Sequence, residues 1–92
     1  MTGYEDFNSD EMEALEKKVR RVLEREGEAH TYSLANEKLS HEAHGWTFDT
    51  FRMALTALRK KWEDEGKIRV KTEGNNPVKA KKKWVPTDKL GD

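Results

Sequence analysis

The hydrophobic pattern of this chain changes its period at Gly66, and this change limits the folds open to it. Before Gly66, apolar residues recur every three to four positions, the spacing of helices that bury one face. After Gly66 they alternate with charged residues, as in strands with one buried face. We therefore expect a helical body followed by β-structure, an α+β domain.

The first helix is expected to run from about Ser9 to Glu26. Its apolar face consists of Met12, Leu15, Val19, Val22 and Leu23. Asn8 and Glu11 have the spacing of a capping box, and Gly27 stands where a left-handed residue commonly ends a helix. Residues 1–8 would then form an N-terminal extension.

Two further helices are expected before Gly66. The second would be capped by Ser33 and end near Gly45. Its predicted apolar stripe is Ala35, Leu39 and Ala43, with Leu34 beside it. The third would span about residues 47–65, capped by Thr47 or Asp49. Its predicted buried stripe is Phe51, Leu55, Leu58 and Trp62.

Residues 67–86 are predicted to form a β-hairpin. Two alternating runs flank Gly74-Asn75-Asn76-Pro77, which is a dense turn signal. Residues 28–32, between the first two helices, leave room only for a short strand. After Pro86, residues 87–92 are expected to be a flexible tail.

Length and composition exclude several classes of protein. Ninety-two residues suffice for one small domain, which we place at residues 9–86. The absence of cysteine excludes a disulfide scaffold or a thiolate nucleophile. No apolar run or signal peptide is evident, which favours an intracellular location, cytoplasmic or nucleoid-associated, with no membrane partner. His41 and His44 lack a third ligand at metal-site spacing, and no catalytic set or phosphate loop is evident, so we expect no metal, no cofactor and no enzyme activity.

The net charge of zero conceals an uneven distribution. Residues 1–66 contain ten basic and fifteen acidic residues, whereas residues 67–92 contain eight basic and three acidic ones. The two parts therefore carry net charges of −5 and +5. A basic C-terminal segment suits a polyanionic partner, although short lysine runs are also common on solvated surfaces.

The order of these elements, together with Ser33-Leu34-Ala35, the pair Leu55 and Leu58, and Glu65-Gly66-Lys67-Ile68, resembles the winged-helix family of helix-turn-helix proteins. The resemblance covers about residues 9–86 and implies a three-helix domain with a C-terminal β-hairpin wing. It also implies that the third helix enters the major groove of DNA, with the wing on the phosphate backbone. Two features depart from the family pattern: the interval from Leu58 to Gly66 is about one turn longer, and the second helix lacks closely spaced leucines.

The resemblance points to two sets of residues that contact DNA. The recognition-helix set is Trp46, Asp49, Arg52, Met53, Thr56 and Lys60. The wing set is Arg69, Lys71, Lys79, Lys81 and Lys83. These residues occupy alternate positions of the two strands and so are expected on one face of the hairpin. Arg52 could donate two hydrogen bonds to guanine, and Met53 could contact a thymine methyl group. Asp49 could accept a hydrogen bond from the amino group of cytosine. Trp46 has two open roles, packing at the edge of the core or stacking on a sugar or base.

The function these observations favour is binding of double-stranded DNA, as a transcriptional regulator or accessory factor. One alternative is a winged helix that binds a protein partner through an acidic helical face. RNA binding is a third possibility, which would need exposed aromatic side chains. A homodimer remains open, because helix-turn-helix proteins often pair to contact two half-sites. For the wing lysines, the alternative role is protection of a strand edge against aggregation.

Overall fold

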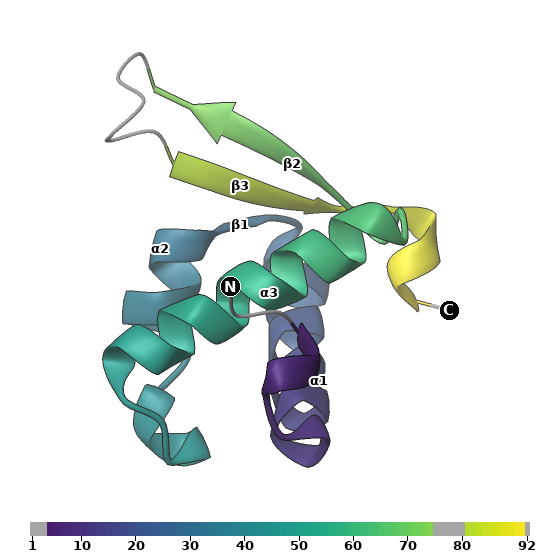
Figure 1. Cartoon of the computed structure of the whole chain (residues 1–92). Coiled ribbons are helices and arrows are strands. Elements are labelled where there is room, and N and C mark those ends of the chain that lie inside the picture. The colour runs from purple at the N-terminus through teal and green to yellow at the C-terminus, as the bar shows by residue number, and fades with distance from the viewer. Residues whose placement is uncertain (1–3, 75–80, 92) are drawn as a thin grey trace.

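The computed structural model describes residues 4–74 and 81–91 of the chain, which form an α+β fold (Figure 1). Its helices are α1 (Ser9–Glu26), α2 (Thr31–Ser33) and α3 (Phe48–Asp64). Its strands are β1 (Ala29–His30), β2 (Ile68–Glu73) and β3 (Lys81–Pro86), which form one antiparallel sheet in the order β1-β3-β2. Shorter helical turns lie at Tyr4–Asp6, Leu34–Lys38, His41–His44 and Asp88–Gly91.

Helix α1 has the bounds that the sequence predicts. The Asn8 side chain accepts hydrogen bonds from the backbone N–H groups of Asp10 and Glu11, which satisfies two donors that lack partners within the helix. Gly27 ends the helix at a φ of 83°, a left-handed conformation that glycine adopts without steric cost. All five residues of the predicted apolar face are buried.

The second helical segment differs from the prediction. It starts at Thr31, so that Ser33 lies inside it with helical backbone angles and makes no capping bond. The segment continues as a π-helical turn to Lys38 and ends at Leu39, whose backbone is extended. Leu34 is buried, but Ala43 is exposed. Ala35 is also buried and Leu39 packs against the core, so the predicted stripe is wrong only at Ala43, which a single helix does not connect to the others.

Helix α3 follows the predicted pattern. Thr47 caps it by accepting a hydrogen bond from the backbone N–H of Thr50. The four residues of the predicted stripe are fully buried, together with Ala54. Gly66, with a φ of 73°, turns the chain from this helix toward β2.

The hairpin strands pair in a register that separates two faces. Val70 lies opposite Trp84, and Lys71 lies opposite Lys83. Ile68 and Trp84 are buried on the face toward the helices, whereas Arg69 and Lys71 on the opposite face are exposed. The short segment predicted between the first two helices is β1, which pairs with the other side of β3.

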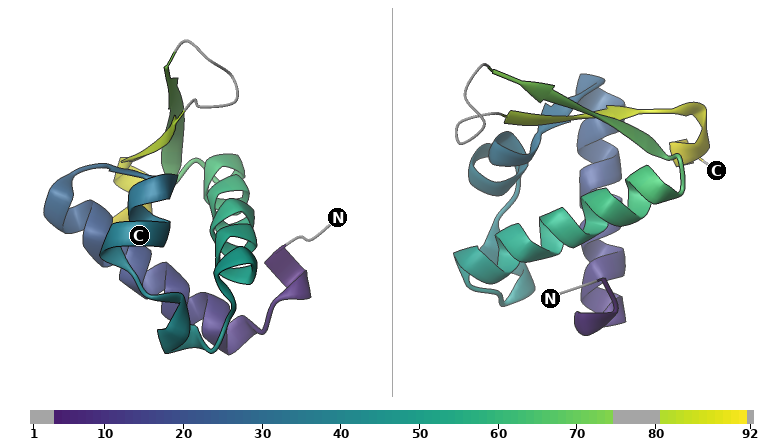
Figure 2. Two further views of the ribbon diagram at one scale, coloured as in Figure 1. Left: turned by 90° about the vertical axis from the view of Figure 1, so that its left-hand side faces the viewer. Right: turned by 45° about the horizontal axis from the view of Figure 1, so that its top comes forward.

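The core lies where α1, α3 and the sheet meet (Figure 2). Trp62 of α3 and Trp84 of β3 are both fully buried and meet edge to face, with ring centroids 6.2 Å apart. The indole N–H of Trp62 donates to Glu16 of α1, and that of Trp84 donates to Thr31 of α2. These two side chains therefore connect the three helices to the sheet.

Both ends of the described chain pack against this core. Residues 87–92 are expected to be a flexible tail, but Asp88–Gly91 form a helical turn and Leu90 is only 3% exposed. At the other end, the Tyr4 hydroxyl donates to Glu16, which fastens the first helical turn to α1. The expectation for the tail was wrong because the partners of Leu90 are distant in the sequence.

None of the helices in the described part of the chain has the length and apolar character needed to cross a membrane.

Replacing Leu90 by alanine tests the packing of the C-terminal turn. We expect this variant to lose about 2–5 kcal/mol of unfolding free energy, as large-to-small substitutions in protein cores do. Urea denaturation of the two proteins measures the difference. A change below about 0.5 kcal/mol, typical of surface substitutions, would instead indicate a flexible tail.

Candidate functional site

The outward face of α3 brings together most of the residues predicted for DNA recognition. Asp49, Arg52, Met53 and Thr56 line one shallow depression, and Lys60 is exposed further along the helix. Their positions follow from the buried stripe, because residues opposite it on the helix face solvent. Met53 is 45% exposed, which is unusual for a large apolar side chain in the described part of this protein. The Thr56 hydroxyl donates to the backbone oxygen of Arg52 at 3.1 Å, which leaves its lone pairs free to accept.

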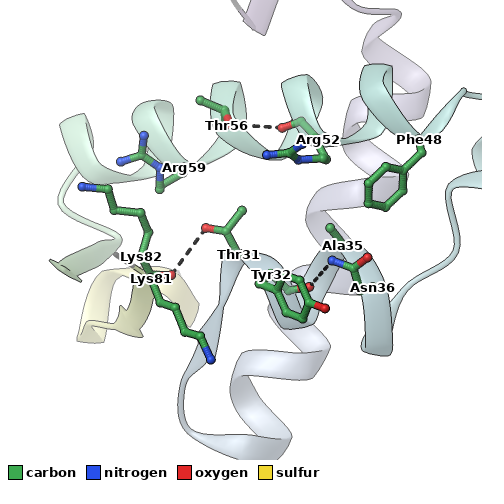
Figure 3. Close-up of a pocket in the computed structure, with 10 residues that line it drawn as sticks. All are labelled: Thr31, Tyr32, Ala35, Asn36, Phe48, Arg52, Thr56, Arg59, Lys81 and Lys82. Carbon is green, nitrogen blue, oxygen red and sulfur yellow. Dashed lines mark hydrogen bonds between the residues drawn. The ribbon is translucent and has the colours of Figure 1, made fainter. Parts of the chain in front are cut away.

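A cleft of about 520 Å³ lies between α2, α3 and β3, next to this face. In the left view of Figure 2, α2 and α3 stand side by side below the hairpin. Figure 3 shows α3 on one side of the cleft, α2 on the other, and the lysines of β3 at one end. Its lining residues are Thr31, Tyr32, Ala35, Asn36, Phe48, Arg52, Thr56, Arg59, Lys81 and Lys82. Arg52 and Thr56 belong to both the cleft and the outward face of α3, so the two surfaces are continuous.

Four cations and no acid line this cleft: Arg52, Arg59, Lys81 and Lys82. None of the ion pairs found within residues 4–74 and 81–91 includes these four side chains. The Lys82 ammonium donates to the hydroxyl of Thr72, a neutral partner, at 2.9 Å. The positive charges of the cleft therefore reinforce one another, and an anion placed there would neutralise them.

The walls of the cleft are joined through Thr31. Its hydroxyl accepts from the indole N–H of Trp84 at 2.8 Å and donates to the backbone oxygen of Lys82 at 3.4 Å. On the following turn, the Asn36 side-chain amide donates to the backbone oxygen of Tyr32 at 2.9 Å. These bonds hold α2 against β3 and keep Tyr32 at the edge of the cleft.

The outer face of the hairpin carries the predicted wing cations, with one difference. Arg69, Lys71, Lys81 and Lys83 share this face as the parity predicts, and Lys79 lies outside the described residues. Lys83, however, is paired with Glu28, whose carboxylate is 2.7 Å away, and with Glu73. The hydrogen bonds that Lys83 donates to these two carboxylates raise the pKa of Lys83, and the one to Glu73 lowers the pKa of Glu73. The charge of Lys83 is thus largely compensated within the protein, unlike those of the cleft.

Trp46 lies in an aromatic cluster and not on the outward face of α3. Its ring centroid is 5.0 Å from that of His44, in a stacked arrangement, and 5.8 Å from that of Phe7. Its side chain is half-buried against the core. Of its two predicted roles, this position supports packing.

His44 is buried and only 7% exposed, although histidine is a polar residue. Its ring stacks against the rings of both Trp46 and Phe51, and its Nε2 atom has no hydrogen-bond partner. Burial lowers the pKa of His44 below its ordinary value of 6.5, and the nearby charge of Lys18 lowers it further. In the described part of the chain, no group of three or more possible ligands is arranged to hold a metal ion.

Sequence reasoning missed Tyr32, Arg59 and Lys82 as members of the site. Tyr32 is 60% exposed and lies beside the four cations of the cleft. The parity of β3 places Lys82 on the same sheet face as Trp84, which suggested an inward side chain, but at this end of the strand that face borders the cleft. A signal for Tyr32 was available in the sequence. Tyr32 and Asn36 are four residues apart, which places both on the same side of a helical turn.

Comparisons of the chain with protein-family models, with curated proteins and with solved structures find no match.

The buried ring of His44 predicts a loss of stability on acidification. The unfolded chain takes up a proton near pH 6.5, the ordinary pKa of histidine, whereas folded His44 stays neutral to lower pH. Because the unfolded state then binds more protons, the free energy of unfolding falls as the pH drops below this value. Urea unfolding at a series of pH values should show this fall to be smaller in His44→Phe than in the wild type. Parallel curves for the two proteins would contradict it.

Proposed function

We propose that this protein is a winged-helix domain that binds double-stranded DNA through α3 and the hairpin. The described elements support this proposal through their order: a long helix, a short strand, a short helical segment, a turn at Gly45, a longer helix and a hairpin. The short strand pairs with the hairpin, and α2 and α3 stand side by side below it. Such a domain would act as a transcriptional regulator or a DNA-associated accessory factor.

The observation that carries the proposal is the continuous cationic surface of α3 and the cleft. Arg52, Arg59, Lys81 and Lys82 hold four positive charges without an acid among the lining residues of the cleft. A chain of zero net charge that gathers uncompensated cations in one place incurs repulsion, which an anionic partner relieves. DNA is such a partner, with about one negative charge per 1.7 Å of duplex.

In the proposed complex, α3 lies in the major groove, which is about 12 Å wide and admits a helix. Arg52 donates two hydrogen bonds to guanine, Met53 contacts a thymine methyl group, and Asp49 accepts from the amino group of cytosine. Asp49 also lies in the first turn of α3, where a carboxylate is stabilised by the helix dipole. The exposed cations of the hairpin and Lys60 contact phosphates, which position the protein without reading sequence.

The alternative, a protein-binding module with an acidic helical face, receives less support from the exposed positions of α1. These carry both signs of charge: Asp10, Glu13, Lys17, Arg21, Glu24, Arg25 and Glu26. The acidic excess of residues 1–66 is therefore not concentrated on that helix. Capture of a protein partner by a chain that fails to bind duplex at low salt would favour this alternative. Light scattering with and without duplex would determine whether the domain pairs as a homodimer.

Charge reversal at Arg52 tests the proposed recognition face. We expect Arg52→Glu to weaken duplex binding by at least tenfold, because a bidentate arginine–guanine contact contributes about 1–3 kcal/mol and the new carboxylate repels phosphate. Arg21→Glu makes the same change of charge at an exposed position of α1 and should bind nearly as the wild type does. Fluorescence anisotropy at several salt concentrations measures both affinities. Equal losses in the two variants would contradict the assignment of the face.

Removal of the carboxylate that holds Lys83 should strengthen binding. In Glu73→Gln, Lys83 loses one of its two anionic partners and becomes more available to phosphate. We expect tighter duplex binding, with the slope of log K against log salt steeper by up to about 0.9, the value for one additional phosphate neutralised. Glu24→Gln makes the same change of charge on α1 and is the matched control. A variant that binds no more tightly than this control would show that Lys83 does not face the backbone.

A further inference from the structure

We infer that the cleft between α2, α3 and β3 holds an unpaired nucleotide, so that the protein prefers duplex DNA with a single-stranded extension to blunt duplex. This inference rests on the proposed function and extends it to the form of the DNA. It is carried by the exposed ring of Tyr32, which lies beside uncompensated cations in a recessed part of the surface.

Tyr32 presents an exposed aromatic ring at the edge of the cleft. Its side chain is 60% exposed, although Trp62, Trp84 and Phe51 are fully buried. The backbone that carries it is held on both sides, by the bonds of Thr31 to β3 and by the bond from Asn36. An aromatic ring on a fixed backbone loses little conformational freedom when a base stacks on it. Tyr32 is thus a preformed platform at the edge of the cleft.

The charges around this platform indicate what stacks there. Arg52 and Arg59 reach the cleft from α3, and Lys81 and Lys82 from β3, so cations lie on two sides of the space in front of α2. A nucleotide offers a phosphate to such cations and a planar base to an aromatic ring. Surfaces that combine a positive groove with an aromatic platform bind single-stranded nucleic acid in this way.

Base pairing decides between a duplex and an unpaired strand as the occupant. Inside a duplex, the faces of each base are covered by its neighbours, so a tyrosine ring has no free base to stack on. A base in a single-stranded extension exposes its face without the cost of unstacking the helix. The cleft, recessed between two helical segments and a strand, suits a single strand better than the wide backbone of a duplex.

The shared residues supply the path between the two sites. Arg52 and Thr56 line both the outward face of α3 and the cleft. A strand that leaves a duplex bound on α3 would therefore enter the cleft directly. The π-helical turn at Leu34–Lys38, which carries Asn36, is consistent with a specialised site, since such turns are frequent at functional positions.

Binding to three labelled DNAs tests the inference. The first probe is a blunt duplex. The other two are the same duplex with a four-nucleotide thymidine extension at a 3′ end or at a 5′ end. Fluorescence anisotropy measures the affinity for each. Stacking of one base contributes about 1–3 kcal/mol, so at least one extension should tighten binding by about fivefold or more. Tyr32→Ala should bind extended and blunt duplex with about equal affinity. Tyr32→Phe, which keeps the ring, should retain the preference for the extended duplex. Glu37→Ala, at an exposed position of the same segment, is the control and should also retain the gain.

The outcomes separate this inference from the proposed function. If blunt duplex binds and neither extension improves binding, the inference is wrong and the proposed function stands. If the gain survives in Tyr32→Ala, the extension acts through its charge alone and the inference is likewise overturned. If neither duplex nor extended duplex binds at low salt, the proposed function itself fails. Thermal unfolding of each variant, monitored by circular dichroism, establishes that Tyr32→Ala remains folded at the temperature of the measurement.

Discussion

The contact between Trp62 and Trp84 is the interaction on which the rest of the structure depends. Their rings meet edge to face, and each indole N–H then reaches a different helix: Trp62 donates to Glu16 of α1, and Trp84 to Thr31 of α2. A chain in which 39% of the residues are charged has few large apolar side chains, so this pair contributes a large share of its buried apolar surface. Because the pair joins α3 to β3 and β3 to α2, it also sets the distance between the walls of the cleft.

The arrangement of charge follows from this framework. On the outer face of the sheet, Lys71 and Lys83 lie directly opposite each other, an unfavourable pairing that Glu28 and Glu73 offset. In the cleft, the corresponding repulsion among four cations is not offset by any acid that lines it. Lys83 is thus compensated within the protein, whereas the four cations of the cleft have no acid among its lining residues. That difference, more than the number of lysines in the hairpin, supports the proposal that an anionic partner binds at the cleft and α3.

The parts of the fold that sequence predicted well are those with local causes. The cap at Asn8, the left-handed glycine at Gly27 and the stripe of α3 all depend on residues within a few positions of one another. The predictions failed where distant residues compete with local preference. Ser33 suits a helix cap, yet the bonds of Thr31 to Trp84 and Lys82 start the helix two residues earlier. Leu90 lies in a polar segment that follows a proline, yet its side chain packs in the hydrophobic core.

By itself, the sequence determined the α+β class, the bounds of α1, the buried face of α3 and the set of exposed residues on that helix, because helix and strand periodicity decide which side of an element is apolar. Only the tertiary structure decided which cations act together. Lys83 and Glu28 are far apart along the chain but meet across the sheet, and Tyr32, Arg59 and Lys82 come from three elements that meet at one cleft. Electrostatic interaction depends on distance in space, and the packing of helices against the hairpin sets that distance.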